Sequence, residues 1–173
     1  MKNTIIFDLD GTLAIIEKRR KLAGSPTGKT PTPSKMNWDV FFDADNIKLD
    51  EPNIPVIKMA QTFHKDGFKI VIFSGRNDRS FHTTKQWLND HDVPFDLLVM
   101  RPDKFKDESW PIASGNPATK AMRFMPDEIL KKEMLDTFVN KDDVLMCVDD
   151  RQKVVDMWRA NGLTCFQVAP GNF

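Results

Sequence analysis

Short apolar runs alternate along this chain with segments in which apolar residues recur every three or four positions. A short apolar run bounded by turn residues is typical of a buried β-strand, and the wider spacing is typical of a helix with one buried face. We predict strands at 4–7, 69–73, 97–100, 144–148 and 164–168. We predict helices at 54–65, 80–90, 127–138 and 152–161, two of which are followed by the terminating glycines Gly67 and Gly162.

This alternation predicts an α/β fold, a doubly wound parallel sheet in three layers with helices on both faces. Such folds bind their ligands beyond the carboxyl ends of the strands. The chain has 173 residues, of which 40% are hydrophobic. This is enough for one core, so we expect a single domain over residues 1–173, with its functional residues just after the strands.

Two segments do not fit the alternation. Residues 14–50 contain a basic run and then Gly, Pro, Ser and Thr in quick succession, and residues 101–125 are interrupted by prolines and a glycine. We predict that both are irregular insertions, loops or small flaps near the site, and that no large cap domain is present.

The charges of the chain balance, with 25 Lys and Arg against 25 Asp and Glu. Zero net charge argues against non-specific binding of long nucleic acids, but not against binding of one phosphate group. Carboxylates end the first apolar run, so we predict neither a signal peptide nor a membrane span and expect a cytoplasmic protein. Cys147 and Cys165 lie in apolar runs and are expected to be buried thiols without a disulfide or a zinc site.

The first predicted strand is followed by Asp8-Leu9-Asp10-Gly11-Thr12. Alternation along the strand direction places Asp8 and Asp10 on the same side, and Gly11 permits a sharp turn. Two carboxylates in one small volume repel each other unless a cation lies between them or one is protonated. The pair therefore suggests a metal, a proton-transfer role, or both.

Further polar residues follow two other predicted strands. Asp149-Asp150 comes after the fourth strand, and Ser74-Gly75-Arg76 comes after the second. Oxygen ligands without clustered His or Cys favour a hard cation, and Mg²⁺ suits a phosphorylated substrate best. The hydroxyl, main-chain N–H groups and guanidinium of the second run suit an anion. We expect all of these groups to meet at one edge of the sheet.

Four sequence elements in this order resemble those of the haloacid dehalogenase (HAD) superfamily of phosphotransferases: Asp8-Leu9-Asp10-Gly11-Thr12, Ser74-Gly75-Arg76, Lys131 and Asp149-Asp150. Residues 127–131 and 148–173 are similar to the phosphatase domain of bacteriophage polynucleotide kinase/3′-phosphatase. The resemblance is weakest in the two insertions. It implies a HAD-like fold and a Mg²⁺-dependent hydrolysis of phosphomonoesters through an aspartyl-phosphate.

The resemblance also implies roles for the acidic residues. Asp8 would be the nucleophile, and Asp10 would protonate the leaving group and then deprotonate a water molecule. The carboxylates of Asp8 and Asp150, with the main-chain carbonyl of Asp10, would hold Mg²⁺. Asp149 would support the metal or orient a basic neighbour.

A second set of residues would bind the substrate phosphate, namely Thr12, Arg19, Ser74, Gly75, Arg76 and Asp127. Ser74 and the catalytic Lys131 would contact the phosphoryl oxygens. Arg19 and Arg76 occupy the places of two arginines that matter for activity in the family. Asp127 lies four residues before Lys131, on the same helical face, and would fix the lysine.

Residues 23–30 also satisfy a loose P-loop pattern. A working P-loop follows a buried strand and opens a helix, but here a charged run precedes the pattern and Pro31 and Pro33 follow it. We therefore predict a solvated loop. The kinase half of the related enzymes is not recognisable, and we expect a stand-alone phosphatase.

The four tryptophans raise the question of base stacking. Trp87 and Trp158 lie in predicted helices and are expected in the core. Better candidates for a nucleobase contact are aromatic residues of the insertions: Trp38, Phe41, Phe42 and Trp110. Packing of a flap on its own sheet explains these four equally well.

Three functions remain open. The leading one is removal of a terminal 3′-phosphate from DNA or RNA, because a site without a large cap admits a polymer end. The second is a nucleoside monophosphate phosphatase, favoured by zero net charge and by insertions that could close over a small molecule. The third is a non-catalytic binder of phosphorylated ends or of a protein, disfavoured because every residue needed for chemistry is present. We expect no membrane binding and no obligatory protein partner, and a location in the host cytoplasm if a phage encodes the protein.

Overall fold

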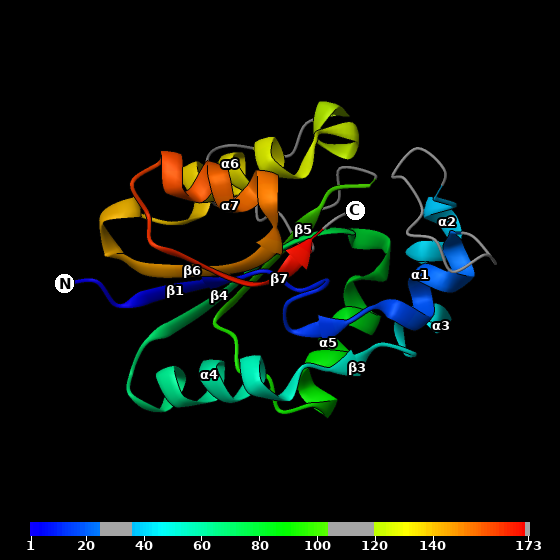
Figure 1. The fold of residues 1–173 in the computed structure, drawn as a ribbon, viewed down its shortest axis with the longest axis horizontal. Coiled ribbons are helices and arrows are strands. Elements are labelled where there is room, and N and C mark those ends of the chain that lie inside the picture. The colour runs from blue at the N-terminus through cyan, green and yellow to red at the C-terminus, as the bar shows by residue number, and fades with distance from the viewer. Residues whose placement is uncertain (25–35, 104–119, 172–173) are drawn as a thin grey trace.

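The computed structural model describes residues 1–24, 36–103 and 120–171. These residues form a five-stranded parallel sheet with the order β5-β4-β1-β6-β7 (Figure 1). Its strands are β1 (Thr4–Phe7), β4 (Lys69–Asn77), β5 (Leu97–Arg101), β6 (Val144–Arg151) and β7 (Cys165–Gly171). The predicted strands are confirmed, although β4 and β6 continue beyond their apolar runs. Strand pairing uses main-chain groups, so polar residues can continue it. The pairing of β4 with β5 and that of β6 with β7 both resume in these polar ends after a shift in register.

Helices cover both faces of the sheet. The main helices are α4 (Ile54–Lys65), α5 (Phe81–Asp90), α6 (Asp127–Phe138) and α7 (Gln152–Ala160), with short 3-10 turns at η2 (Asp78–Ser80) and η5 (Lys141–Asp143). Ile5 and Phe7 pack in one core with residues of α4 and α5, and the intervening Ile6 packs in another with residues of α6 and α7. Figure 1 shows α6 and α7 above the sheet and α4 and α5 below it. The predicted three-layer α/β class is confirmed.

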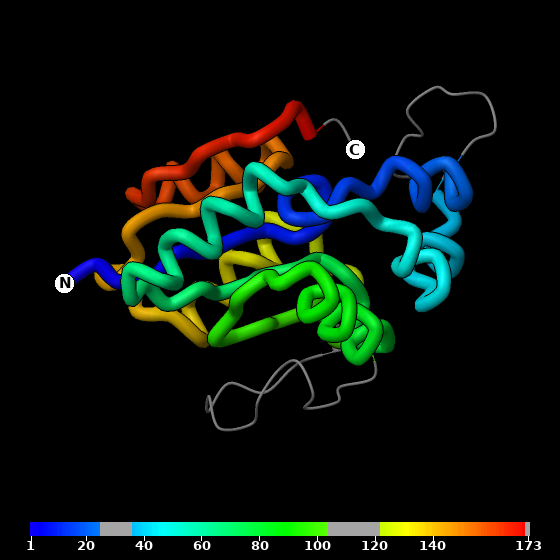
Figure 2. The backbone as a smooth tube through the Cα atoms, turned by 90° about the horizontal axis from the view of Figure 1, so that it is seen from below, coloured from blue at the N-terminus to red at the C-terminus, as the bar shows by residue number. Residues whose placement is uncertain are grey.

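The segment after β1 forms a small substructure at the carboxyl end of the sheet (Figures 1 and 2). The chain enters this substructure through β2 (Ala14–Ile15) and leaves it through β3 (Glu51–Pro52), and these two strands pair antiparallel. Between these strands lie α1 (Glu17–Ala23), α2 (Trp38–Phe41) and α3 (Ala44–Ile47). The prediction of an irregular segment is therefore wrong for its described part.

Local capping explains these short helices. The Asn37 side chain accepts hydrogen bonds from the first main-chain N–H groups of α2, and Asp43 does the same for α3. Helices of four residues are too short to show a 3.6-residue period, which is why the apolar spacing did not predict them.

The second insertion begins inside β5, and its described part ends with η4 (Lys120–Phe124). Trp110 and most of the P-loop-like run at 23–30 lie outside the described residues. Trp87 and Trp158 are buried in the core, as predicted, and both cysteines are buried and free. No helix in the described ranges is long and apolar enough to cross a membrane.

Candidate active site

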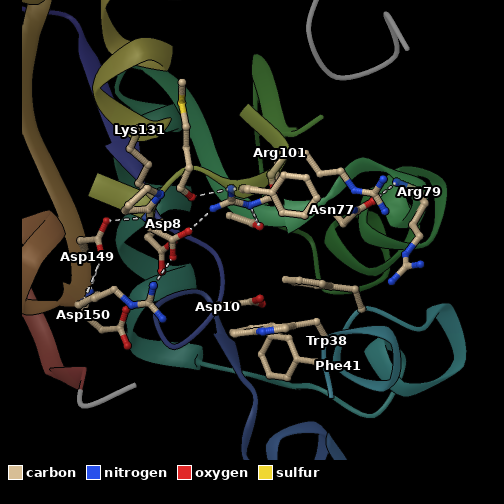
Figure 3. Close-up of a pocket in the computed structure, with 18 of the residues that line it drawn as sticks. Asp8, Asp10, Trp38, Phe41, Asn77, Arg79, Arg101, Lys131, Asp149 and Asp150 are labelled. Atoms are coloured by element: carbon tan, nitrogen blue, oxygen red, sulfur yellow. Dashed lines mark hydrogen bonds and ion pairs between the residues drawn. The ribbon is translucent and has the colours of Figure 1, made fainter. Parts of the chain in front are cut away.

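Three carboxylates meet at the carboxyl end of the sheet, those of Asp8, Asp149 and Asp150 (Figure 3). β1 and β6 are neighbours, with Phe7 opposite Val148, and the Asp8 main-chain N–H donates to the Val148 carbonyl at 2.9 Å. One oxygen of each carboxylate lies within 4.8 Å of the others, and none of the three residues is more than 6% exposed. The structure thus brings Asp8 of the first acidic pair together with both residues of the second pair, whereas Asp10 is not part of the cluster.

Each oxygen of the Asp8 carboxylate has its own donor. Lys131 Nζ, from α6, donates to Oδ1 at 2.6 Å, and the Thr12 hydroxyl donates to Oδ2 at 2.9 Å. The same ammonium donates to Asp149 Oδ2 at 2.8 Å, an oxygen that the Trp158 indole N–H also approaches at 3.3 Å. Burial alone would lower the pKa of Lys131, but Asp149 and Asp8 outweigh it and raise that pKa, so the lysine stays charged.

One ammonium does not balance three buried carboxylates. Burial raises the pKa of Asp8 well above its ordinary value, Lys131 opposes this, and Asp149 and Asp150 add to it. Burial, followed by the charge of Asp149, raises the pKa of Asp150 to about 7. A cation between these oxygens would restore the balance, and an all-oxygen donor set suits Mg²⁺. The residues present therefore fit the metal that the family implies.

Gly11 makes room for this arrangement. It has a φ of +86°, and a Cβ at this position would lie 2.2 Å from Asp150 Oδ2. Any side chain here would therefore displace the Asp150 carboxylate from the cluster. The main-chain carbonyl of Asp10 stays a predicted ligand of the metal.

The carboxylate of Asp10 contacts two buried arginines. Arg19 Nη2 donates to Asp10 Oδ1 at 2.6 Å and Arg76 Nε at 2.7 Å. Both guanidiniums also bond Asp50 Oδ2, at 2.8 and 2.7 Å. Burial favours a raised pKa for Asp10, but the charges of Arg19 and Arg76 outweigh it and lower that pKa to about 2. Asp10 is therefore ionised in the free protein.

Of the six residues predicted to bind the phosphate, two line the cavity at the site and four lie behind it. Gly75 and Asp127 line the cavity. The four side chains with no exposed surface are Thr12, Arg19, Ser74 and Arg76. Arg19 and Arg76 are bonded to carboxylates, so in this structure they reach a substrate only through Asp10. Ser74 Oγ accepts the Arg76 main-chain N–H at 3.1 Å within the last part of β4, where its pairing register with β5 shifts.

Asp127 joins two strand ends at the first turn of α6. Its Oδ1 accepts from Arg101 Nη2 at 2.5 Å, and its Oδ2 accepts from Arg151 Nη1. Arg101 also donates to the Gly75 carbonyl at 3.0 Å, which links α6 to the last part of β4. The predicted role of Asp127 beside Lys131 is electrostatic in the structure, because its charge adds to those that raise the pKa of Lys131.

Sequence reasoning missed three charged residues of the site. Arg101 ends β5 and Arg151 ends β6, so the rule that functional residues follow strands would have found both. Asp50 has no such signal, because it comes just before β3 and reaches Arg19 and Arg76 only through the tertiary fold.

A cavity of about 490 Å³ opens over these groups. Asp8, Lys131, Asp149 and Asp150 lie at one side of it (Figure 3). Further lining residues come from α2 and its C-cap, from the segment around η2 and from η4: Trp38, Phe41, Phe42, Asn77, Arg79, Arg123 and Phe124. The cavity therefore combines a charged centre with an apolar wall.

This three-layer parallel sheet, with Asp-x-Asp after its first strand and a buried lysine beside a second acidic pair, defines a HAD-family phosphatase. Residues 30–173 match the family model of the polynucleotide kinase PNKP phosphatase domain. The chain belongs to this family. Asp8 and Asp10 precede the matched range, and the structural similarities below extend over almost the whole chain.

Two solved structures show the similarity in three dimensions, described as the Pnkp1/Rnl/Hen1 complex and the Pnkp1/Rnl/Hen1 RNA repair complex. Each is 28% identical to this chain with a TM-score of 0.70, and they cover 99% and 98% of it. The chain spans only 47% and 43% of those chains. A putative phosphatase from Clostridium difficile, 14% identical with a TM-score of 0.57 over 95% of this chain and 84% of its own, shares the fold.

Proposed function

We propose that this protein is a Mg²⁺-dependent phosphomonoesterase that removes 3′-phosphates from polynucleotide ends through an aspartyl-phosphate at Asp8. The observation that carries the proposal is the geometry of Asp8, whose two oxygens are held by Thr12 and Lys131 beside a cluster suited to a divalent cation. Membership of the PNKP phosphatase family supports the polynucleotide substrate.

In the first step, an Asp8 carboxylate oxygen attacks phosphorus. An O–P bond to Asp8 forms while the bond from phosphorus to the 3′ oxygen breaks, and the leaving oxygen takes a proton from Asp10. Because Arg19 and Arg76 keep Asp10 ionised in the free protein, Asp10 has to gain this proton as the substrate binds.

In the second step, Asp10 removes a proton from a water molecule that attacks the same phosphorus. The bond between phosphorus and Asp8 breaks, inorganic phosphate leaves, and the Asp8 carboxylate is restored. The two arginines now serve the reaction directly, since they hold Asp10 in the position and the protonation state of a base.

The remaining groups neutralise charge. Lys131 lies against Asp8 and is placed to stabilise the equatorial phosphoryl oxygens, which carry most of the negative charge in phosphoryl transfer. Asp8, Asp149 and Asp150 would hold Mg²⁺, which supplies further charge neutralisation at the phosphoryl group when bound.

A second candidate is a phosphatase of free nucleoside monophosphates. The observation that favours it is the cavity of about 490 Å³, whose aromatic side suits the base of a single nucleotide. Binding there would not need a groove for a longer strand.

The two candidates differ in their best substrate. Phosphate release in Mg²⁺ is measured from an oligonucleotide with a 3′-phosphate, the same oligonucleotide with a 5′-phosphate, and free 3′- and 5′-monophosphates, with Asp8→Asn as the blank. We expect the highest kcat/KM on the oligonucleotide 3′-phosphate. Higher kcat/KM on free monophosphates would replace the first function by the second, and equal release by Asp8→Asn would remove both.

A further inference from the structure

An aromatic wall, which we define as Trp38, Phe41 and Phe42, forms the side of the cavity contributed by α2. Figure 3 shows Trp38 and Phe41 across the cavity from Arg101. The Trp38 ring stacks on Phe42 with centroids 5.8 Å apart and meets the edge of Phe41 at 5.6 Å. Phe41 is buried, but Trp38 is 42% exposed, in contrast to the core tryptophans.

The wall is fixed relative to the catalytic acid. Arg19 Cζ lies 4.2 Å from the centre of the Phe41 ring, and Arg19 Nη1 donates to the Phe41 carbonyl at 3.0 Å. The same guanidinium bonds Asp10. One buried arginine therefore holds the aromatic wall and the Asp10 carboxylate together.

A second contact fixes the beginning of α2. Arg79 Nη2 donates to Asp39 Oδ1 at 2.9 Å, which ties α2 to η2 across the rim of the cavity. Together with the Asn37 cap, this contact orients a half-exposed indole toward the cavity without help from a ligand. A flat aromatic surface whose side chains are already held in place favours binding of a flat, apolar ligand group, because little conformational entropy is lost.

We propose that the aromatic wall binds the base of the nucleotide whose phosphate is removed, with Trp38 as the stacking surface. This inference rests on the proposed function, because that function places the phosphate at Asp8. The same cavity contains Asp8 and the wall, and a terminal nucleotide carries an anionic group and a flat aromatic group at its two ends. Stacking accepts all bases, because every base has a π-face.

The experiment compares two oligonucleotides that carry a 3′-phosphate and differ only in the last nucleotide, which has a base in one and is abasic in the other. The ratio of their kcat/KM values is measured for the wild type, Trp38→Ala and Trp38→Phe. Phe166→Ala is the matched control, because Phe166 is also half exposed but lies on β7 and is not among the residues that line this cavity.

We expect a ratio of about 10 in the wild type, as for one stacked base, and a ratio near 1 in Trp38→Ala. Trp38→Phe keeps most of the preference, and Phe166→Ala keeps all of it. Melting temperatures of the variants verify that each is folded. Equal activity of the wild type on both substrates, or an unchanged ratio in a folded Trp38→Ala, overturns the base site while leaving the phosphatase function in place. Phosphate release from neither substrate overturns both proposals.

Discussion

In the proposed mechanism Asp8 has to be ionised and keep one oxygen aimed at phosphorus, although burial raises its pKa well above the ordinary value. Two donors hold its carboxylate, the Thr12 hydroxyl at Oδ2 and the Lys131 ammonium at Oδ1, and the charge of Lys131 also acts to lower that pKa. The two donors differ in kind. In the proposed mechanism Lys131 would bring charge to the reaction, whereas Thr12 would bring only orientation.

Thr12→Val therefore tests orientation without changing the charge of the site. Loss of one hydrogen bond to a charged group costs about 1.5–3 kcal/mol, so we expect kcat to fall about ten- to a hundredfold. The control is Thr62→Val, since Thr62 bonds the Lys58 carbonyl on the exposed face of α4. Steady-state kinetics measures both variants, and wild-type kcat in Thr12→Val would show that Asp8 needs no second donor.

At the scale of single residues, the sequence predicts where a side chain lies better than which side chains it contacts. Asp8, Asp149 and Asp150 could be placed because the carboxyl ends of parallel strands are fixed by topology. Burial was not visible in the sequence, so Arg19 and Arg76 were expected to bind phosphate although they bond Asp10 and Asp50.

At the scale of elements, the turn after β1 leaves room for the three carboxylates proposed to hold the metal. Gly11→Ala would place a Cβ 2.2 Å from Asp150 Oδ2, and Gly67→Ala provides the control, because Gly67 has a similar φ of +89° with nothing within 4 Å. Both variants strain the backbone, but only Gly11→Ala displaces a carboxylate. We expect the Mg²⁺ concentration for half-maximal activity to rise about tenfold or more in Gly11→Ala alone. An equal rise in both would mean that backbone strain, rather than the collision, weakens the site.

The start of α6 gives the fold a dependence on pH. Burial opposes ionisation of Asp127, but Arg151 and Arg101 outweigh it and lower the pKa of Asp127 below its ordinary value of 3.8. A lowered pKa in the folded state means that this stabilisation is present above pH 3.8 and is lost as the pH falls through the folded-state pKa.

Asp127→Asn should therefore reduce the free energy of unfolding by about 2 kcal/mol near neutral pH. The difference from the wild type should shrink below the ordinary pKa of 3.8. Urea unfolding from acidic to neutral pH measures the difference in the free energy of unfolding. Asp45→Asn is the control, because Asp45 forms an exposed pair with Lys48. A difference that stays constant with pH would contradict the ionised pairing of Asp127.

The longer helices could be predicted because each buries one face over several turns. α4 and α6 have the predicted bounds for this reason. A strand such as β1 could be predicted because it is buried on both faces and therefore forms a continuous apolar run. The helices α2 and α3 depend on caps and on contacts with the rest of the protein, such as the bond from Arg19 to the Phe41 carbonyl, and such contacts leave no local pattern.

At the scale of the whole molecule, the three carboxylates proposed to hold Mg²⁺ reduce the stability of the fold when no cation offsets their charge. In the metal-free protein, burial and Asp149 raise the pKa of Asp150 to about 7, so ionisation of Asp150 destabilises the fold as the pH rises from its ordinary pKa of 3.8. If the cluster holds Mg²⁺ as proposed, binding of the metal to the folded state would reverse the effect by mass action.

Asp150→Asn should consequently melt several degrees above the wild type in chelator at about pH 8. In saturating Mg²⁺ the order should reverse, because only the wild type keeps the full set of carboxylates. Thermal melts in the two buffers measure this. A wild type that gains no stability from Mg²⁺ would contradict the assigned metal site.

In the proposed mechanism, the phosphoryl group passes through Asp8. Stopping the enzyme during turnover and treating it with borohydride would reduce an aspartyl-phosphate to homoserine, whose position mass spectrometry identifies. We predict homoserine at residue 8 in the wild type with substrate and none without it. Phosphate release with an unmodified residue 8, or with the modification at another carboxylate, would contradict the account.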